Sequence, residues 1–365
     1  MIIGVDGNEA NVKKRVGVSI YALNLLQYFK KHSSNDTQFI IYLRNSPLYD
    51  LPEASQYFQY EIVPGPIFWS QFFLPLFLYL HKKITIFFSP AHYVPRFCPV
   101  STVVTIHDLA YLLYPNEFLQ KDLFKLTHWT KHAILNSKKI IAVSKTTKKD
   151  ICKNYHIEDD KINVIYNGYQ KSVKNPLSSW QSEFKVKEPT ILYVGTLQPR
   201  KNINTLIQAF VKFKQVYPEF KLMLAGKKGW MYDRIFDEIS DQGLNNDVYF
   251  TDYISDYQLM FLYKNVFCLV MPSYYEGFGI PVLEAMSFGC PVISSFSSSL
   301  PEVGGDASLY FDPNNMYDLF EKLSLLKRDN SLKSELIKKG LKRVKDFSWE
   351  KCGEETLKVI KDAAV

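Results

Sequence analysis

Two carboxylates stand eight positions apart in a run rich in glycine and proline. The run is PSYYEGFGIPVLEAMSFGCP, from 272 to 291, and it contains Glu276 and Glu284. A proline typical of a first helical turn separates them, and Gly277 and Gly279 let backbone amides approach a ligand closely. One carboxylate can accept hydrogen bonds from sugar hydroxyls and the other from ribose hydroxyls, which suits a sugar nucleotide. The alternative is a helix cap at Glu276 and an exposed helical residue at Glu284.

Two adjacent cations, Arg200 and Lys201, follow a glycine turn that begins at Gly195. The segment GTLQPRKN comes directly after an apolar run and opens an amphipathic stretch. A helix N-terminus favours anions through its unpaired amides and its dipole. Because Arg offers a fork of donors and Lys a point charge, the pair suits a pyrophosphate. Two solvated cations at a helix start are the alternative.

Two further segments lie at the ends of strand-like runs. His107 and Asp108 begin the segment HDLAYLL, which also contains Tyr111. A histidine at the carboxyl end of a strand lies where substrates bind and can share a proton or a hydrogen bond, although a structural role is the alternative. The first loop of the chain leads to Gly17 at a helix start and could meet phosphates, but it has neither GxGxxG nor GxxxxGK[ST].

Short apolar runs alternate with amphipathic stretches and would position these residues. The strand-like runs of the first series are Met1–Val5, Phe39–Leu43, Ile84–Ser89, Ser101–Ile106, Ile140–Val143 and Asn163–Ile165. Those of the second series are Thr190–Val194, Lys221–Ala225, Val248–Phe250, Phe267–Met271, Val292–Ser294 and Ser308–Phe311. Helical segments between them include Val18–Lys31, Asn202–Phe213 and Asp256–Lys264. This alternation predicts an α/β protein with two doubly wound parallel sheets, each binding ligands beyond the carboxyl ends of its strands.

The domain boundaries follow from the same pattern. We expect a first Rossmann-like domain over 1–172 and a second over 173–346, because 172–189 is polar, contains proline and lacks periodicity. The tail 347–365 predicts a long amphipathic helix with no strand after it, which could pack back across the first domain.

Composition excludes several classes of protein. The 365 residues are 47% hydrophobic and 22% charged, which excludes disordered and fibrous chains. Residues 1–175 hold 21 basic and 13 acidic side chains (+8), and the rest of the chain 23 and 24 (−1). A basic half favours nucleic acid, an anionic membrane surface or phosphorylated substrates, with scattered solvating lysines as the alternative. No basic run interleaved with aromatic residues resembles a nucleic-acid motif.

Cysteine usage and hydropathy favour a cytoplasmic protein. The five cysteines are far apart and lack metal spacing, as expected of a reducing compartment, and no signal peptide is visible. The most apolar segment, 67–80, is IFWSQFFLPLFLYL and is shorter than the roughly 20 residues needed to span a bilayer. It predicts a partly buried helix, with a ledge facing the membrane as the alternative.

Together these residues resemble the retaining GT-B glycosyltransferases of the glycogen-synthase-like "group 1" family. The resemblance covers nearly the whole chain and rests on EGFGIPVLE from Glu276 to Glu284 and on the Gly195 segment with Arg200 and Lys201. Supporting marks are HD at 107, AVSK at 142, VIYNG at 164, and SLPEVGG at 299. The runs LAGKKGW at 224 and WSQFFLPLFLYLHKKITIFFSP at 69 are similar to bacterial mannosyltransferases of surface polysaccharide synthesis.

The resemblance implies a role for each matching position. It implies a GT-B fold with two Rossmann-like domains facing a deep cleft, the first binding the acceptor and the second the sugar nucleotide, and a terminal helix that crosses back to the first domain. The implied catalytic residues are Arg200 and Lys201 on the diphosphate, Glu276 on the donor sugar, and His107 on the transferred sugar or the acceptor. Further implied donor contacts are Gly17, Gly195, Tyr253, Ile254, Asp256, Gly277, Phe278, Gly279 and Glu284, and the implied acceptor contacts are Asp108 and Tyr111. Gly17 departs from the family pattern, since Val16 stands where relatives often have a paired glycine and Ser19 where many have arginine.

The implied activity is transfer of a hexose from a nucleotide sugar to a glycan or lipid-linked oligosaccharide, with retention at the anomeric carbon and without a metal or other cofactor. No Asp-x-Asp occurs in the sequence, which agrees with leaving-group stabilisation by cations. GDP-mannose is the first choice of donor and UDP-hexoses the next, with peripheral membrane contact and no nucleic-acid partner expected. A nucleotide-sugar 2-epimerase, a phosphorylase and a non-enzymatic sugar-binding protein are the competing hypotheses.

Overall fold

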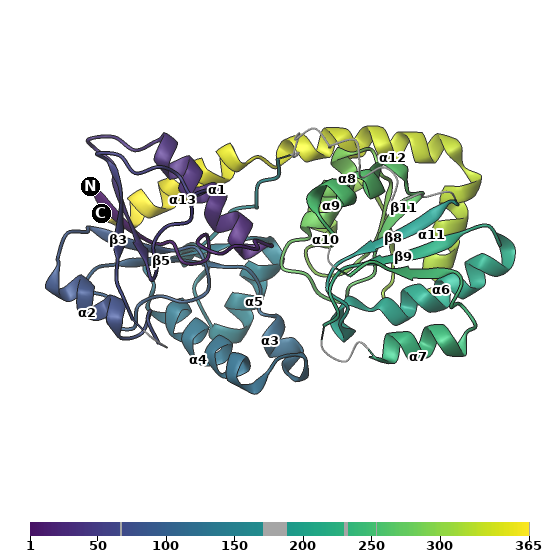
Figure 1. Ribbon diagram of the computed structural model, residues 1–365, viewed down its shortest axis with the longest axis horizontal. Helices are drawn as coiled ribbons and strands as arrows, with labels where there is room; N and C mark the ends of the chain where they lie inside the picture. The colour runs from purple at the N-terminus through teal and green to yellow at the C-terminus, as the bar shows by residue number, and fades with distance from the viewer. Residues whose placement is uncertain (66–67, 171–187, 230–232, 253, 365) are drawn as a thin grey trace. The chain divides into compact units, whose positions relative to one another are not determined.

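A computed structural model describes residues 1–65, 68–170, 188–229, 233–252 and 254–364. The chain divides into two compact units, each built around one parallel sheet. Unit 1 comprises Met1–Pro115, Leu119–Gly168 and Phe347–Val365, and unit 2 comprises Asn116–Phe118 and Tyr169–Asp346. Figure 1 shows the strands of each sheet with helices packed against them.

Unit 1 holds a seven-stranded sheet in the order β3-β2-β1-β4-β5-β6-β7, and all its pairings are parallel. Its strands are β1 (Ile2–Asp6), β2 (Gln38–Leu43), β3 (Phe58–Ile62), β4 (Ile86–Ser89), β5 (Thr102–Ile106), β6 (Lys139–Ala142) and β7 (Ile162–Val164). Its α-helices are α1 (Val18–Lys31), α2 (Phe73–Leu80), α3 (Ala110–Leu113), α4 (Gln120–Asn136), α5 (Lys145–Tyr155) and α13 (Trp349–Ala364). The sequence therefore predicted six of these strands and missed β3.

The terminal helix α13 belongs to unit 1 although it follows the whole of unit 2 in the chain. It packs beside α1, as Figure 1 shows in yellow and purple, and it also contacts β4, β5 and β6. Its buried face includes Leu357, Val359 and Ile360, which join the same apolar core as Leu25 and Phe29 of α1. The amphipathic pattern of the tail thus encodes a helix that completes the core of unit 1.

Unit 2 holds a six-stranded parallel sheet in the order β10-β9-β8-β11-β12-β13. Its strands are β8 (Thr190–Val194), β9 (Lys221–Ala225), β10 (Val248–Phe250), β11 (Cys268–Met271), β12 (Val292–Ser295) and β13 (Ser308–Phe311). Its α-helices are α6 (Ile203–Val216), α7 (Asp233–Asp241), α8 (Asp256–Asn265), α9 (Ile280–Ser287), α10 (Leu300–Gly304), α11 (Met316–Arg328) and α12 (Asn330–Arg343). All six predicted strands are present.

The described part of the apolar segment, residues 68–80, is helical only over Phe73–Leu80. Helix α2 begins at Phe73, and the turn before it includes Phe68, whose φ of 69° lies in the left-handed region. Within the described residues, no helix combines the length and the apolar character that crossing a bilayer requires. Leu74 and Leu78 are buried, whereas Leu76 is 60% exposed. The expected partly buried helix is therefore present but shorter than predicted.

Candidate functional site

The two strongest sequence motifs meet at one place in the sheet of unit 2. Strands β8 and β11 are neighbours at the point where the strand order reverses, with β9 on the other side of β8 and β12 on the other side of β11. The loops after β8 and β11 therefore leave the sheet side by side. Doubly wound sheets bind their ligands at such a reversal point, beyond the carboxyl ends of the strands.

Lys201 and Glu276 form the central ion pair of this site. Lys201 Nζ donates to Glu276 Oε1 at 2.6 Å, and the side chains are 11% and 12% exposed. Ser273 Oγ donates to the same carboxylate oxygen at 2.7 Å. Burial alone would raise the pKa of Glu276, but the positive charges of Lys201 and Arg200 outweigh it and hold that pKa below its ordinary value. Glu276 is thus a fixed carboxylate and not a helix cap.

Arg200 is held by the backbone of the facing loop. Its Nη1 donates to the carbonyl oxygen of Tyr275 at 3.1 Å, and its own carbonyl oxygen accepts from the backbone N–H of Tyr274 at 2.9 Å. Asn202, which begins α6, donates from Nδ2 to the carbonyl oxygen of Pro272 at 3.0 Å. These contacts join the loop after β8 to the loop after β11, so the two cations keep a fixed relation to Glu276.

Gly195 permits the close approach of two neighbouring turns. Its φ is 152°, and a Cβ at Gly226, in the turn after β9, would lie 2.0 Å from the carbonyl oxygen of Gly195. No side chain fits between these turns. This clash requires glycine at Gly226, whereas a Cβ at Gly195 would meet the side-chain hydroxyl of Tyr193 at 2.7 Å. A contact of Gly195 with the donor stays a prediction.

Serine hydroxyls hold the loop that carries Glu276, and the sequence did not predict these contacts. Ser298 Oγ accepts from the backbone N–H of Glu276 at 3.0 Å and also contacts the carbonyl oxygen of Glu276. Ser299 Oγ bonds to the carbonyl oxygens of Glu276 and Phe278, each at 2.8 Å. Ser295 Oγ donates to the carbonyl oxygen of Ser273 at 2.6 Å. The signal for these contacts was the run SSFSSS, from 294 to 299, which begins in the last two residues of β12 and continues into the loop after it.

The loop then turns into α9 at Gly279, whose φ is 110°. A side chain at that position would be strained and would also meet Leu300 at 2.9 Å. Phe278 is buried, with 4% of its surface exposed, and Gly277 is partly buried. The predicted contacts of Gly277, Phe278 and Gly279 with a donor therefore fall at a helix start whose backbone is fixed by packing.

Glu284 lies in α9 and has surroundings unlike those of Glu276. Tyr263 of α8 donates from its hydroxyl to Glu284 Oε2 at 2.9 Å. Burial raises the pKa of Glu284 to about 7, with the Tyr263 hydrogen bond lowering it and the negative charge of Asp256 raising it. Glu284 is thus a partly buried side chain with a specific partner, not the exposed helical residue of the alternative interpretation.

The segment expected to border the nucleobase leads into α8, the helix that supplies Tyr263 to Glu284. Ser255 caps this helix in a capping box with Gln258, and Asp256 is its first residue. The negative charge of Asp256 raises the pKa of Glu284. Ile254 is partly buried beside the cap. Tyr253 lies outside the described residues, and the nucleobase contacts expected of Tyr253, Ile254 and Asp256 stay predictions.

In unit 1, the segment at the end of β5 is largely buried. His107 is 8% exposed, its Nε2 lies 2.8 Å from the carbonyl oxygen of Pro90, and its ring packs edge-on against Tyr21 at 4.9 Å. Burial lowers the pKa of His107 to about 4, so the imidazole is neutral at pH 7. Because a carbonyl oxygen can only accept, Nε2 carries the proton, which leaves Nδ1 as an acceptor.

Asp108 and Tyr111 have partners within unit 1. Asp108 Oδ1 accepts from the backbone N–H of Ala110 at 2.9 Å and so shapes the turn before α3. Tyr111 is 1% exposed, and its hydroxyl lies 2.9 Å from that of Tyr155. The structure places Tyr111 in the core, where it supports the segment, and no acceptor contact of either residue is tested.

Gly17 begins α1 with a φ of 44°, and a Cβ there would meet nothing within 4 Å. Its backbone is therefore open, as the predicted phosphate contact requires, although that contact is untested. Among the described residues, no three His, Cys, Asp or Glu side chains gather closely enough to hold a metal ion. A reaction without a metal stays a prediction.

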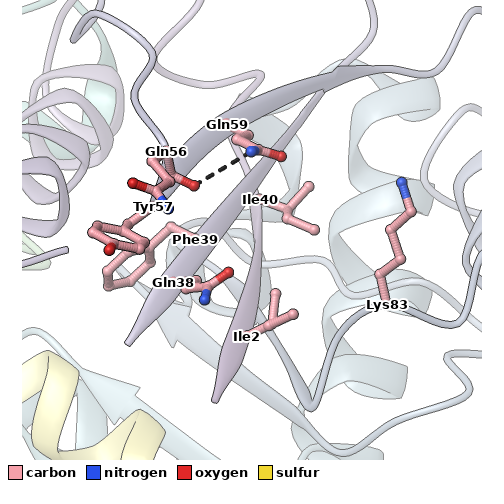
Figure 2. A pocket seen from close by; sticks show the side chains of 8 residues that line it. All are labelled: Ile2, Gln38, Phe39, Ile40, Gln56, Tyr57, Gln59 and Lys83. Atoms are coloured by element: carbon pink, nitrogen blue, oxygen red, sulfur yellow. Dashed lines mark hydrogen bonds between the residues drawn. The ribbon is translucent and has the colours of Figure 1, made fainter. Parts of the chain in front are cut away.

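A hollow of about 220 Å³ lies in unit 1 at the amino ends of β1, β2 and β3 (Figure 2). It is lined by Ile2 and Gln38, which begin β1 and β2, and by Tyr57 and Gln59 at the start of β3. Its one cation, Lys83, donates to Glu61 Oε1 at 3.0 Å. Because ligands of parallel sheets bind beyond the carboxyl ends, this hollow at the amino ends is not the candidate site.

Two family models match the sequence. "Glycosyl transferases group 1" matches residues 174–343, and "Glycosyltransferase Family 4" matches residues 16–172. O-antigen chain mannosyltransferase B of Escherichia coli is 32% identical over 289 residues, which are 76% of this chain and 74% of that protein.

Solved structures share the fold. Sucrose-phosphate synthase from Thermosynechococcus elongatus matches with a TM-score of 0.75 at 20% identity, over 99% of this chain and 98% of that one. HepE from Anabaena, solved in complex with UDP-glucose, matches with a TM-score of 0.74 at 15% identity, over 99% of each chain. Both agree with the two parallel-sheet units described above.

Proposed function

Because the chain belongs to the group 1 glycosyltransferases of the GT-B fold, we propose that it transfers mannose from GDP-mannose, with retention at the anomeric carbon, to a growing lipid-linked surface glycan. The observation that carries this proposal is the Lys201–Glu276 pair beside Arg200, at the strand-order reversal of unit 2. The mannosyl specificity is supported by the name of the relative from Escherichia coli.

In the proposed reaction, the bond between the anomeric carbon and the diphosphate oxygen breaks and a bond to an acceptor hydroxyl forms. The leaving diphosphate gains negative charge, which Arg200 and Lys201 stabilise at positions fixed before the reaction. The proton of the acceptor hydroxyl passes to the leaving phosphate oxygen in a front-side attack. The alternative is a reaction in two steps, with a covalent intermediate between the sugar and Glu276, which gives the same products.

The remaining residues divide between the two substrates. Glu276 and the amides of Phe278 and Gly279 would bind the donor sugar, and Glu284 would accept hydrogen bonds from the ribose. Neutral His107 would accept a hydrogen bond through Nδ1 from the transferred sugar or the acceptor. No step in this scheme requires a metal, because two side-chain cations supply the positive charge.

A UDP-hexose donor is the second candidate, since HepE, which shares the fold, was solved with UDP-glucose. Thermal unfolding with GDP, UDP, ADP or dTDP, each with EDTA, distinguishes the two. A nucleotide at 100 times its dissociation constant should add about 2.7 kcal/mol of stability. Selective stabilisation by GDP supports the mannosyl proposal, and selective stabilisation by UDP overturns it in favour of the second candidate. A response to none of the four contradicts a preformed donor site.

We also propose that α2 contacts an anionic membrane surface. Leu76, Tyr79 and Leu80 are 60%, 49% and 71% exposed, and Lys82 and Lys83 follow the helix. Apolar side chains beside cations suit the boundary between headgroups and acyl chains. Leu76→Gln should weaken partitioning onto phosphatidylglycerol vesicles, whereas Leu341→Gln, at a 45% exposed position of α12, should not. If partitioning is insensitive to salt, to anionic lipid and to Leu76→Gln, the proposal fails.

A further inference from the structure

We propose that Tyr263 is a positioning residue for the nucleotide ribose, whose hydroxyl holds one carboxylate oxygen of Glu284 so that the other oxygen accepts from the ribose. This inference rests on the proposed function, in which Glu284 binds the ribose. It adds a residue from another helix that decides how well Glu284 can do so. Tyr263 itself would not touch the nucleotide.

The geometry leaves one oxygen of Glu284 for a ligand. Oε2 accepts from the Tyr263 hydroxyl at 2.9 Å. Oε1 accepts no hydrogen bond from the part of the chain that the structure describes, and it is not among the buried polar atoms that lack a partner. It therefore keeps some accessible surface. A carboxylate held at one oxygen and open at the other is suited to accept a hydrogen bond from a sugar hydroxyl.

Tyr263 has little freedom to move. Its side chain is 2% exposed, and its ring stacks on Phe288 at 6.2 Å with an interplanar angle of 11°. The helix that carries it is fixed at its start by the capping box of Ser255 and Gln258. A phenol locked by packing at this position orients Glu284 at little cost in side-chain entropy on binding.

A hydrogen bond also holds the backbone of α9 at Glu284. Ser287 Oγ donates to the carbonyl oxygen of Glu284 at 2.8 Å, and it lies 2.8 Å from the hydroxyl of Tyr169. Tyr263 thus contacts the side chain of Glu284, and Tyr169 contacts Ser287, which bonds to the backbone of Glu284. Only the first touches the carboxylate, so the two contributions can be separated by substitution.

The direction of the hydrogen bond follows from the ionisation of both partners. Burial raises the pKa of Tyr263 well above its ordinary value, so the hydroxyl keeps its proton and must be the donor. Burial raises the pKa of Glu284 to about 7, and the Tyr263 hydrogen bond opposes that rise. The other ionisable groups that face this pair are Asp256, Tyr169 and Cys290. None of these is a cation, and Lys264, whose Nζ lies 5.8 Å from the centroid of the Phe288 ring, does not contribute to the pKa of Glu284. The Tyr263 hydroxyl is therefore the group that favours the carboxylate form.

The measured quantity is the ribose preference, defined as the dissociation constant of a 2′,3′-dideoxynucleoside diphosphate divided by that of the ribonucleotide. We would measure it by calorimetry with GDP and dideoxy-GDP, and with UDP and dideoxy-UDP, from pH 6 to pH 8.5. The ratio cancels the ionisation of the phosphates, which both ligands share. It also cancels any inactive fraction, because both constants come from one preparation.

Tyr263→Phe keeps the ring and removes only the hydroxyl. We expect it to lower the ribose preference at pH 7.5 by about three- to tenfold, which is the size of effect that loss of one ordinary hydrogen bond has. In the wild-type protein the preference should rise with pH through about 7. In Tyr263→Phe that rise should move to higher pH, because Glu284 loses the hydrogen bond that lowers its pKa. A merely structural role would not move this midpoint.

The controls separate this inference from the function on which it rests. Tyr310→Phe removes a half-buried hydroxyl that donates to the carbonyl oxygen of Gly305 at 2.7 Å, and it should leave the ribose preference unchanged. Glu284→Gln should bring the preference close to unity, and adding Tyr263→Phe should then change nothing more. An unaltered preference in Tyr263→Phe, or a pH dependence that this variant does not move, overturns the positioning role alone. An unaltered preference in Glu284→Gln overturns the ribose role of Glu284, and the inference with it.

Discussion

Glu276 and Glu284 are the same residue type, eight positions apart, in opposite electrostatic surroundings. Glu276 is paired with Lys201 at 2.6 Å, and its pKa is held below the ordinary value against the effect of burial. Glu284 is bonded to a phenol at 2.9 Å, and burial raises its pKa to about 7. Burial acts alike on both, so the presence of a cation decides the difference. Environments that push two carboxyl groups apart in this way give them different chemical roles.

The difference originates in which element of unit 2 supplies each partner. The loop after β8 brings Lys201 to Glu276, because β8 and β11 are neighbours at the strand-order reversal. Glu284 lies farther along, within α9, where α8 supplies Tyr263 instead. In the proposed function, the first is a fixed charge beside the leaving diphosphate and the second an adjustable carboxyl group beside the ribose. Predictions that treat the two glutamates separately can therefore test the comparison.

The largest expected effect is that of Lys201→Met. Removing the ammonium should lower turnover by roughly two or more decades, because the diphosphate loses a preorganised cation. It should also leave Glu276 without its ion-pair partner and destabilise the protein by about 3–5 kcal/mol. Release of nucleoside diphosphate and thermal unfolding measure the two effects. Turnover near that of the wild type would contradict the electrostatic account.

Two matched variants separate the two effects of Lys201→Met. Lys339→Met removes a 38% exposed lysine that pairs with Glu335 on α12, and it should change stability by less than about 0.5 kcal/mol and leave turnover unaltered. The double variant Lys201→Met with Glu276→Gln should recover stability but not turnover, since it removes the unpaired charge without replacing the cation. Recovery of both would show that the ion pair is structural only.

The next prediction concerns stability without nucleotide. Because the folded pKa of Glu284 is raised to about 7, its favourable contribution is complete below its ordinary pKa of 4.5 and is lost as pH rises through about 7. Glu284→Gln does not titrate, so it should be more stable than the wild type at pH 8.5 by about 1–3 kcal/mol, and not at pH 5. Chemical unfolding at both pH values measures the difference.

Glu276→Gln should behave in the opposite way. The folded pKa of Glu276 is lowered, so its contribution is present above its ordinary pKa and is lost as pH falls through the folded value. Its replacement should therefore destabilise the protein at pH 8.5, where Lys201 is left without a carboxylate. If both substitutions shift stability in the same direction at pH 8.5, the contrast between the two glutamates is wrong.

The fold was predictable where burial leaves a pattern in the sequence. Strands buried on both faces are continuous apolar runs, and these were identified in both units. Strand β3 was missed because it is an edge strand with Gln59 and Glu61 in its interior, and only Phe58 is fully buried. The segment 67–80 misled in the other direction, since an apolar run without a period does not show where helix α2 begins.

The site was predictable where one motif carries the chemistry. The sequence placed Lys201, Glu276 and Glu284 after the correct strands, and their functional roles stay predictions. It could not supply Tyr263 or Ser298, which contact these glutamates from 21 and 22 positions away through single hydroxyls. A hydroxyl is too common in a sequence to mark a contact, and only the fold brings it to one carboxyl group or one amide.

The smallest expected effect comes from Ser298, which acts on the Glu276 side alone. Its φ of 57° lies in the left-handed region, where a Cβ is unfavourable, yet its hydroxyl bonds to the backbone of Glu276. Ser298→Ala should lose the hydrogen bonds and keep the strain, whereas Ser298→Gly loses the same bonds and relieves the strain. We therefore expect the glycine variant to be more stable than the alanine variant by about 0.5–1 kcal/mol.

Both Ser298 variants should lower turnover by a similar, several-fold factor, because each frees the backbone that positions Glu276. Neither should alter the ribose preference, since Ser298 makes no contact with Glu284 among the described residues. Thermal unfolding, turnover and calorimetry measure the three quantities on the same preparations. An alanine variant as stable as the glycine variant would show that the hydroxyl does not hold a strained backbone. A changed ribose preference would show that the two glutamates are coupled through the loop and are not independent, as the comparison requires.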